Sequence, residues 1–167
     1  MTPADLLTDS FERIRALFAD IASGEAGLTR AEWQWRPDDH GNPIAWLLWH
    51  AARVQDDHVA GLAGTAQCWP LWQERVGIEN DDSDIGYGHT AEQVTALQID
   101  DIAELVAYQD AVHKLTLDYL AHVDEAELDR IVDEAWDPPV TAGARLVSVI
   151  GDCLQHLGQA AYVKGLV

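Results

Sequence analysis

Four long stretches of this 167-residue chain repeat apolar residues at the three-to-four-residue spacing of an amphipathic helix. They cover about residues 3–22, 43–62, 101–123 and 142–167. No alternating polar and apolar run of the kind that predicts a strand lies between them. Because each helix must bury its apolar face against another helix, we expect an all-α protein. The pattern predicts a four-helix bundle that forms a single domain over residues 1–167.

The connection between the second and third helices is long, from Gly64 to Thr90, so a simple up-down-up-down order is not required. Near its end, Thr90 followed three residues later by Gln93 predicts the capping box of a short helix. At the start of the second helix, Asn42 is the expected N-cap and Pro43 the first helical residue. The acidic stretch "ENDDSD" in the connection resembles no calcium loop closely, and we interpret it as a solvated turn.

The charge balance excludes several partners. The chain has 29 acidic and 10 basic residues, a formal charge of -19, so nucleic acids and anionic membranes are repelled over most of its surface. Cys68 and Cys153 form no CxxC pair, which is typical of a reduced cytosolic protein. The N-terminus lacks the pattern of a signal peptide, and no apolar run approaches the length of a membrane span. We therefore expect a cytoplasmic location and small-molecule partners.

The fourth helix, within "LVSVIGDCLQHLGQAAYVKGLV", is apolar nearly all round, which predicts that it is buried. It nevertheless carries Asp152 and His156, whose i, i+4 spacing puts both side chains on one face. For a bare pair of this kind an ordinary hydrogen bond is the more frequent explanation. In a buried setting, two ionisable groups one turn apart need a partner, and a metal ion is one.

A third group is available on the second helix, where His50 interrupts an apolar run. A single histidine in such a place is usually a core residue with its hydrogen bonds satisfied. A bundle also collects inward-pointing ligands from facing helices, and two histidines with one carboxylate form an open set for Zn²⁺, Fe²⁺ or Ni²⁺. Cys153 lies about 100° around the helix from Asp152 and is interpreted as a small core residue, not a nucleophile.

The stretches "NPIAWLLWHAARVQDDHVAG", "GYGHTAEQV" and "DPPVTAGARLVSVIGDCLQHLGQAAYVKGL" resemble the DinB-like superfamily of metalloenzymes. The resemblance is greatest to its actinobacterial branch, which is related to mycothiol-dependent maleylpyruvate isomerases and other thiol S-transferases. Many members use three histidines, the last two spaced H-x3-H. Here Asp152 takes the first place of that pair, similar to the glutamate of the isomerase branch. The resemblance implies that His50, Asp152 and His156 bind a divalent metal, zinc first, with nickel and iron as alternatives.

Other polar residues are candidates for the surroundings of this metal. Asp57 and His58 are candidates for orienting a ligand imidazole, and Gln159 for the same shell or the pocket. His89, in "GYGHT", is the loop histidine best placed to reach the mouth of the site. Neighbouring tryptophans such as Trp46 are more often core or interface residues than the lining of a substrate pocket.

The resemblance implies a metal-dependent enzyme that transfers a mycothiol-type thiol to a small electrophile, or a related metal-dependent hydrolase. In either reaction the metal would activate the bound thiol or a water. The alternative is a non-catalytic bundle that binds a metal or an apolar ligand, or a module that forms a homodimer. Dependence of any activity on metal and on His50 distinguishes these interpretations.

Overall fold

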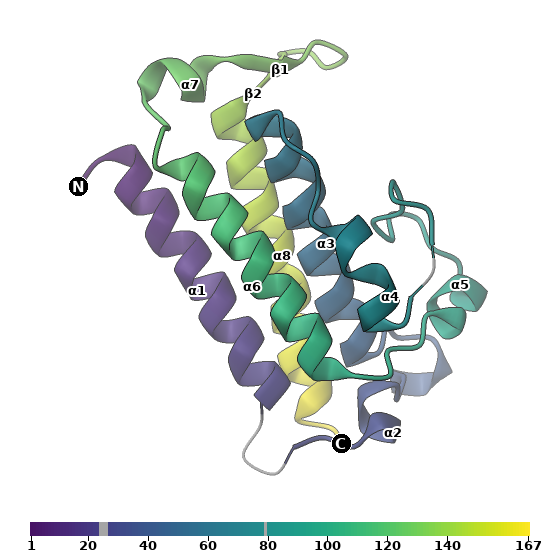
Figure 1. The fold of residues 1–167 in the computed structure, drawn as a ribbon. Helices are drawn as coiled ribbons and strands as arrows, with labels where there is room; N and C mark the ends of the chain where they lie inside the picture. Colours follow the sequence, from purple (N-terminus) through teal and green to yellow (C-terminus); the bar gives the residue numbers. More distant parts are fainter. Residues whose placement is uncertain (24–26, 79) are drawn as a thin grey trace.

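The computed structural model describes residues 1–23, 27–78 and 80–167, and it is dominated by helix (Figure 1). The all-α prediction is confirmed. The four long helices are α1 (Pro3–Ser23), α3 (Ile44–Ala63), α6 (Ile102–Leu120) and α8 (Ala142–Lys164). All four lie within a few residues of the stretches predicted from the apolar spacing.

Each long helix packs against two others. α3 lies beside α6 and α8, and α1 lies beside the same two helices from the opposite side. α1 and α8 run in one direction and α3 and α6 in the other, so the order is down-up-up-down (Figure 1). This order requires a long connection between two parallel helices. The 64–101 connection returns the chain to the end of the bundle where α3 begins.

Shorter elements lie in the connections. They are α2 (Arg30–Trp33), η1 (Pro37–Asp39), η2 (Trp69–Leu71), α4 (Gln73–Val76), α5 (Ala91–Ala96), α7 (Glu125–Asp129), β1 (Ile131–Asp133) and β2 (Val140–Thr141). The two strands pair antiparallel with an irregular register, and they are too short to give an alternating pattern in the sequence. None of the helices in the described part of the chain is long and apolar enough to cross a membrane.

One predicted helix start is confirmed and one is wrong. Thr90 and Gln93 form the expected capping box at the start of α5. Asn42, however, is not the N-cap of α3, because Pro43 has extended backbone angles (φ -72°, ψ 160°) and itself occupies the N-cap position. The helix therefore begins at Ile44, one residue later than expected, without a side-chain hydrogen bond at its cap.

The prediction that the fourth helix is buried all round is wrong. One face of α8 belongs to the core, where Leu146, Cys153 and Leu157 are fully buried. On the outer face, Val147 is 65% exposed and Tyr162 is 69% exposed. Among the long helices, α8 packs mainly on α1 and α3, and its outer side faces solvent. α8 is therefore half-buried, and its polar pair lies at the edge of the core rather than inside it.

Candidate metal centre

His50, Asp152 and His156 meet between α3 and α8, and we call them the His-Asp-His group. One ligand atom from each residue lies within 4.8 Å of the other two. His50 Nε2 is 3.8 Å from Asp152 Oδ2, and His156 Nε2 is 3.7 Å from Asp152 Oδ1. The two imidazole rings are 4.6 Å apart between centroids and nearly perpendicular. The antiparallel packing of α3 and α8 thus brings a histidine from one helix to an i, i+4 pair on the other.

The remaining ring nitrogens hold both imidazoles in one tautomer. His50 Nδ1–H donates to the carbonyl oxygen of Ile85. His156 Nδ1–H donates to Gln159 Oε1 at 2.9 Å. Because both acceptors are oxygens that carry no proton, each Nδ1 carries a proton, and in the neutral form of each ring Nε2 has a free lone pair. Such hydrogen bonds are the usual support of metal-binding histidines.

The carboxylate between them fits a cation. Asp152 Oδ2 is buried, yet it has no hydrogen-bond partner among the described residues. Both imidazole Nε2 atoms are too far away to donate a hydrogen bond to it. Ligand atoms around a tetrahedral ion lie about 3.4 Å apart, close to the two distances found here. A divalent ion would compensate an oxygen whose burial otherwise costs about 1–3 kcal/mol.

The group is buried on one side and accessible on the other. The His50 side chain is only 6% exposed, whereas that of Asp152 is 37% exposed. Burial is the largest effect on His50 and lowers its pKa from 6.5, although the Ile85 carbonyl and Asp152 act in the opposite direction. A lowered pKa keeps the imidazole neutral, which is the form that binds metal. Solvent and small molecules can reach the group from the α8 side.

His89 lies behind His50 and is not a member of the group. Its Nδ1 accepts a hydrogen bond from the Trp46 indole N–H at 3.1 Å, and its Nε2–H donates to Asp84 at 2.9 Å. Trp46 in turn stacks on the His50 ring, with 4.7 Å between centroids and 15° between planes. Trp46 is a core residue, as expected, and it supports one face of a ligand imidazole.

Asp57 and His58 lie farther along α3 and contact each other. His58 Nδ1 is 3.3 Å from Asp57 Oδ2, and the Gln67 amide donates to Asp57 Oδ1 at 2.8 Å. Together with Arg145 they line a polar cavity of about 560 Å³. The hydrogen bonds that orient the imidazoles of the group come instead from Ile85 and Gln159, two residues in other parts of the chain.

Replacing His58 by glutamine should weaken the pH dependence of stability in the metal-free protein. Burial lowers the His58 pKa from 6.5, so the unfolded chain binds the proton more tightly than the folded one. Stability present above pH 6.5 is therefore lost as the pH falls through the lowered pKa. Thermal melting in the presence of a chelator should show that the melting temperature of His58→Gln falls less steeply with falling pH than that of the wild type. The exposed control His122→Gln should keep the wild-type dependence on pH. Equal slopes in all three proteins would contradict this assignment.

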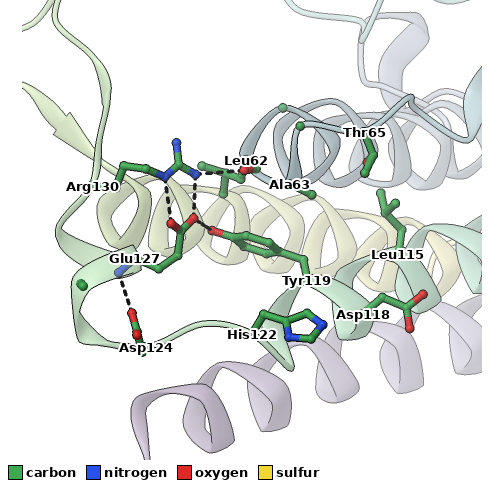
Figure 2. Close-up of a pocket in the computed structure, with 13 residues that line it drawn as sticks. Leu62, Ala63, Thr65, Leu115, Asp118, Tyr119, His122, Asp124, Glu127 and Arg130 are labelled. Atoms are coloured by element: carbon green, nitrogen blue, oxygen red, sulfur yellow. Dashed lines mark hydrogen bonds and ion pairs between the residues drawn. The ribbon is translucent and has the colours of Figure 1, made fainter.

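A large cavity, about 1120 Å³, lies at the end of the bundle between α3, α6 and α7 (Figure 2). Its lining is mostly apolar and includes Leu62 and Leu115. On one side, Glu127 accepts hydrogen bonds from Tyr119 (2.7 Å) and Arg130 (2.6 Å), so these polar groups satisfy one another. Their pairing lowers the Glu127 pKa to about 2. The His-Asp-His group is not part of this lining.

Two imidazoles and a carboxylate on facing helices of a bundle form a group that could hold a metal ion. The chain belongs to the DinB superfamily, whose sequence profile matches residues 6–160. This superfamily includes metal-binding enzymes. A solved structure, described as the crystal structure of the conserved protein of locus from Enterococcus faecalis, is similar over 100% of this chain and 98% of that one, with 31% identity and a TM-score of 0.89. No curated protein matches the chain.

Proposed function

We propose that this protein is a metal-dependent enzyme that transfers a small-molecule thiol, of the mycothiol type, to a small electrophile. The single observation that carries the proposal is the His-Asp-His group, in which two imidazole Nε2 atoms flank the Asp152 carboxylate and its buried Oδ2 has no hydrogen-bond partner among the described residues. Three protein ligands leave coordination positions for a substrate. Membership of a superfamily with metal-binding enzymes supports the same class of activity.

His50, Asp152 and His156 would hold the ion, and Gln159 and Ile85 would keep the imidazoles aligned. A divalent ion bound there supplies Lewis acidity, which lowers the pKa of a thiol or water beside it. In the proposed reaction the thiol would release its proton to solvent, the sulfur would bond to the electrophilic carbon, and the leaving group would depart with its electron pair. The partly exposed side chains of Asp152 and His156 would face the substrates.

The surface charge favours one kind of thiol. A protein with a formal charge of -19 repels an anionic thiol such as glutathione over long range. A sugar-based thiol such as mycothiol presents mostly hydroxyls and amides, which this field does not repel. We therefore propose mycothiol or a similar neutral thiol as the donor and a divalent ion, zinc first, as the cofactor.

Thiol consumption with a panel of electrophiles tests the proposal. The metal-loaded protein should consume mycothiol faster than the uncatalysed reaction, whereas the chelated protein and metal-treated His50→Ala should not. His122→Ala, which changes an exposed histidine far from the group, should retain the wild-type rate. Uncatalysed rates for the loaded protein with mycothiol and with other cellular thiols would contradict the transferase proposal.

A second candidate function is binding of an apolar ligand without catalysis. The large cavity in Figure 2 favours it, because its volume and mostly apolar lining resemble those of small-molecule sites. This cavity lies apart from the His-Asp-His group, so ligand binding there should survive chelation. A fluorescent apolar probe that binds equally well with and without metal, together with an inactive loaded protein, would favour the binding function over the transferase.

A further inference from the structure

We propose that the 82–86 segment positions His50 and thereby sets the metal affinity of the His-Asp-His group. The proposal rests on metal binding by the group, but it does not depend on the thiol transfer proposed above. Ile85 lies in this segment, and its carbonyl is the acceptor for His50 Nδ1. Any shift of the segment would therefore move that acceptor and turn the imidazole.

A buried arginine anchors the segment. Arg53 lies one turn after His50 on α3, and its side chain is fully buried. Its guanidinium donates to the carbonyl oxygens of Asp82 (2.6 Å) and Asp84 (3.2 Å). A hydrogen bond made by a buried charged group is stronger than one between neutral groups. α3 therefore provides both the ligand and the anchor for the segment that orients the ligand.

The Asp84 carboxylate adds a second link to the same imidazole. It accepts hydrogen bonds from the backbone N–H of Gly86 at 2.8 Å and from His89 Nε2–H at 2.9 Å. His89 is in turn the acceptor for the indole of Trp46, which stacks on His50. The segment thus acts on His50 at two points, through the nitrogen that donates to Ile85 and through the ring face that Trp46 covers.

Gly86 allows this close approach. Its φ is +87°, and a Cβ atom there would lie 2.8 Å from Trp49 Cζ3 and 3.0 Å from His50 Nδ1. Distances this short force a neighbour to move, and the neighbours are the ligand and a buried ring. Gly88 has a similar φ of +75°, but a Cβ atom there would meet no described atom within 4 Å. Alanine therefore strains the backbone at both Gly86 and Gly88, but only at Gly86 should it displace His50.

The matched pair Gly86→Ala and Gly88→Ala tests the inference by Co²⁺ binding to the full-length chain. Affinity is measured by competition with a chelator, and the absorption spectrum of bound Co²⁺ reports the ligand geometry. Gly86→Ala should bind about 10–100-fold more weakly than the wild type, with an altered spectrum, which is the usual effect of losing support behind a ligand. Gly88→Ala should stay within about twofold, because its strain does not reach His50.

If Gly86→Ala does not fold, a second variant tests the same inference. His89→Phe keeps an aromatic ring stacked on Trp49 and removes the hydrogen bonds to Asp84 and Trp46. It should weaken Co²⁺ binding by about tenfold at an unchanged helix content. Three results would overturn the inference. The first is wild-type affinity in every variant of Gly86→Ala and His89→Phe that folds, and the second is a loss of affinity in Gly88→Ala equal to that in Gly86→Ala. The third is a wild-type protein that binds no Co²⁺. A wild type that binds Co²⁺ but transfers no thiol would remove the proposed function alone.

Discussion

His50→Ala and His156→Ala should each abolish stoichiometric metal binding. Each imidazole is one of the three groups that would hold the ion in the proposed site, and two remaining ligands should bind it much more weakly. We expect about one divalent ion per chain in the wild type, from the usual composition of such sites, and well below that in either variant. Elemental analysis of protein purified without added metal measures this ratio. Asp152→Ala should weaken binding, because it removes the charge but keeps both imidazoles.

The control for this experiment is His122→Ala, which removes an exposed histidine at the end of α6. It should keep the wild-type ratio of metal to protein. Full occupancy in both His50→Ala and His156→Ala would place the metal elsewhere on the chain. Loss of metal in His122→Ala as well would indicate surface binding, since that side chain lies outside the His-Asp-His group.

The helices and the candidate ligands can be predicted from the sequence for the same reason. Apolar residues repeat with the helical period, so a polar residue on an apolar face is visible as an interruption. His50 is such an interruption, and the i, i+4 spacing of Asp152 and His156 fixes their common face whatever the packing. The bundle and the DinB-like pattern together predict that these side chains meet. In the structure, one ligand atom from each residue lies within 4.8 Å of the other two.

Only part of the support of the site could be predicted. Gln159 is a candidate from the sequence and contacts His156, but most of the support depends on backbone atoms and tertiary contacts. The Ile85 carbonyl has no signature in the sequence, and the acidic stretch was interpreted as a solvated turn. Residue 79 of that stretch lies outside the described residues, and Asp82 is exposed, but Asp84 is half-buried and binds His89. The exposure of the outer face of α8 is not visible in the sequence, because Val147 and Leu154 look like core residues in a helical pattern.

Arg53→Met should be the most destabilising single substitution among the surroundings of the site. The guanidinium is fully buried, donates to Gln67 (2.9 Å) and to two carbonyls of the 82–86 segment, and faces Asp56 at 3.4 Å. Methionine fills part of the volume but leaves the Asp56 carboxylate without its buried cation. Breaking a buried ion pair in this way costs about 3–5 kcal/mol. Urea unfolding followed by far-ultraviolet circular dichroism measures the loss.

The exposed pair Arg13 and Asp9 provides the matched control, because the Arg13 side chain is 74% exposed and its ion pair lies in solvent. Arg13→Met should leave the free energy of unfolding close to the wild-type value, because an ion pair in solvent contributes little to stability. Arg53→Met should also release the 82–86 segment, so its metal affinity should fall more than that of Arg13→Met even under conditions where both proteins are fully folded. A loss of stability below about 1 kcal/mol for Arg53→Met would mean that the buried guanidinium contributes no more than a surface charge. In that case the 82–86 segment would be held mainly by Asp84 and His89.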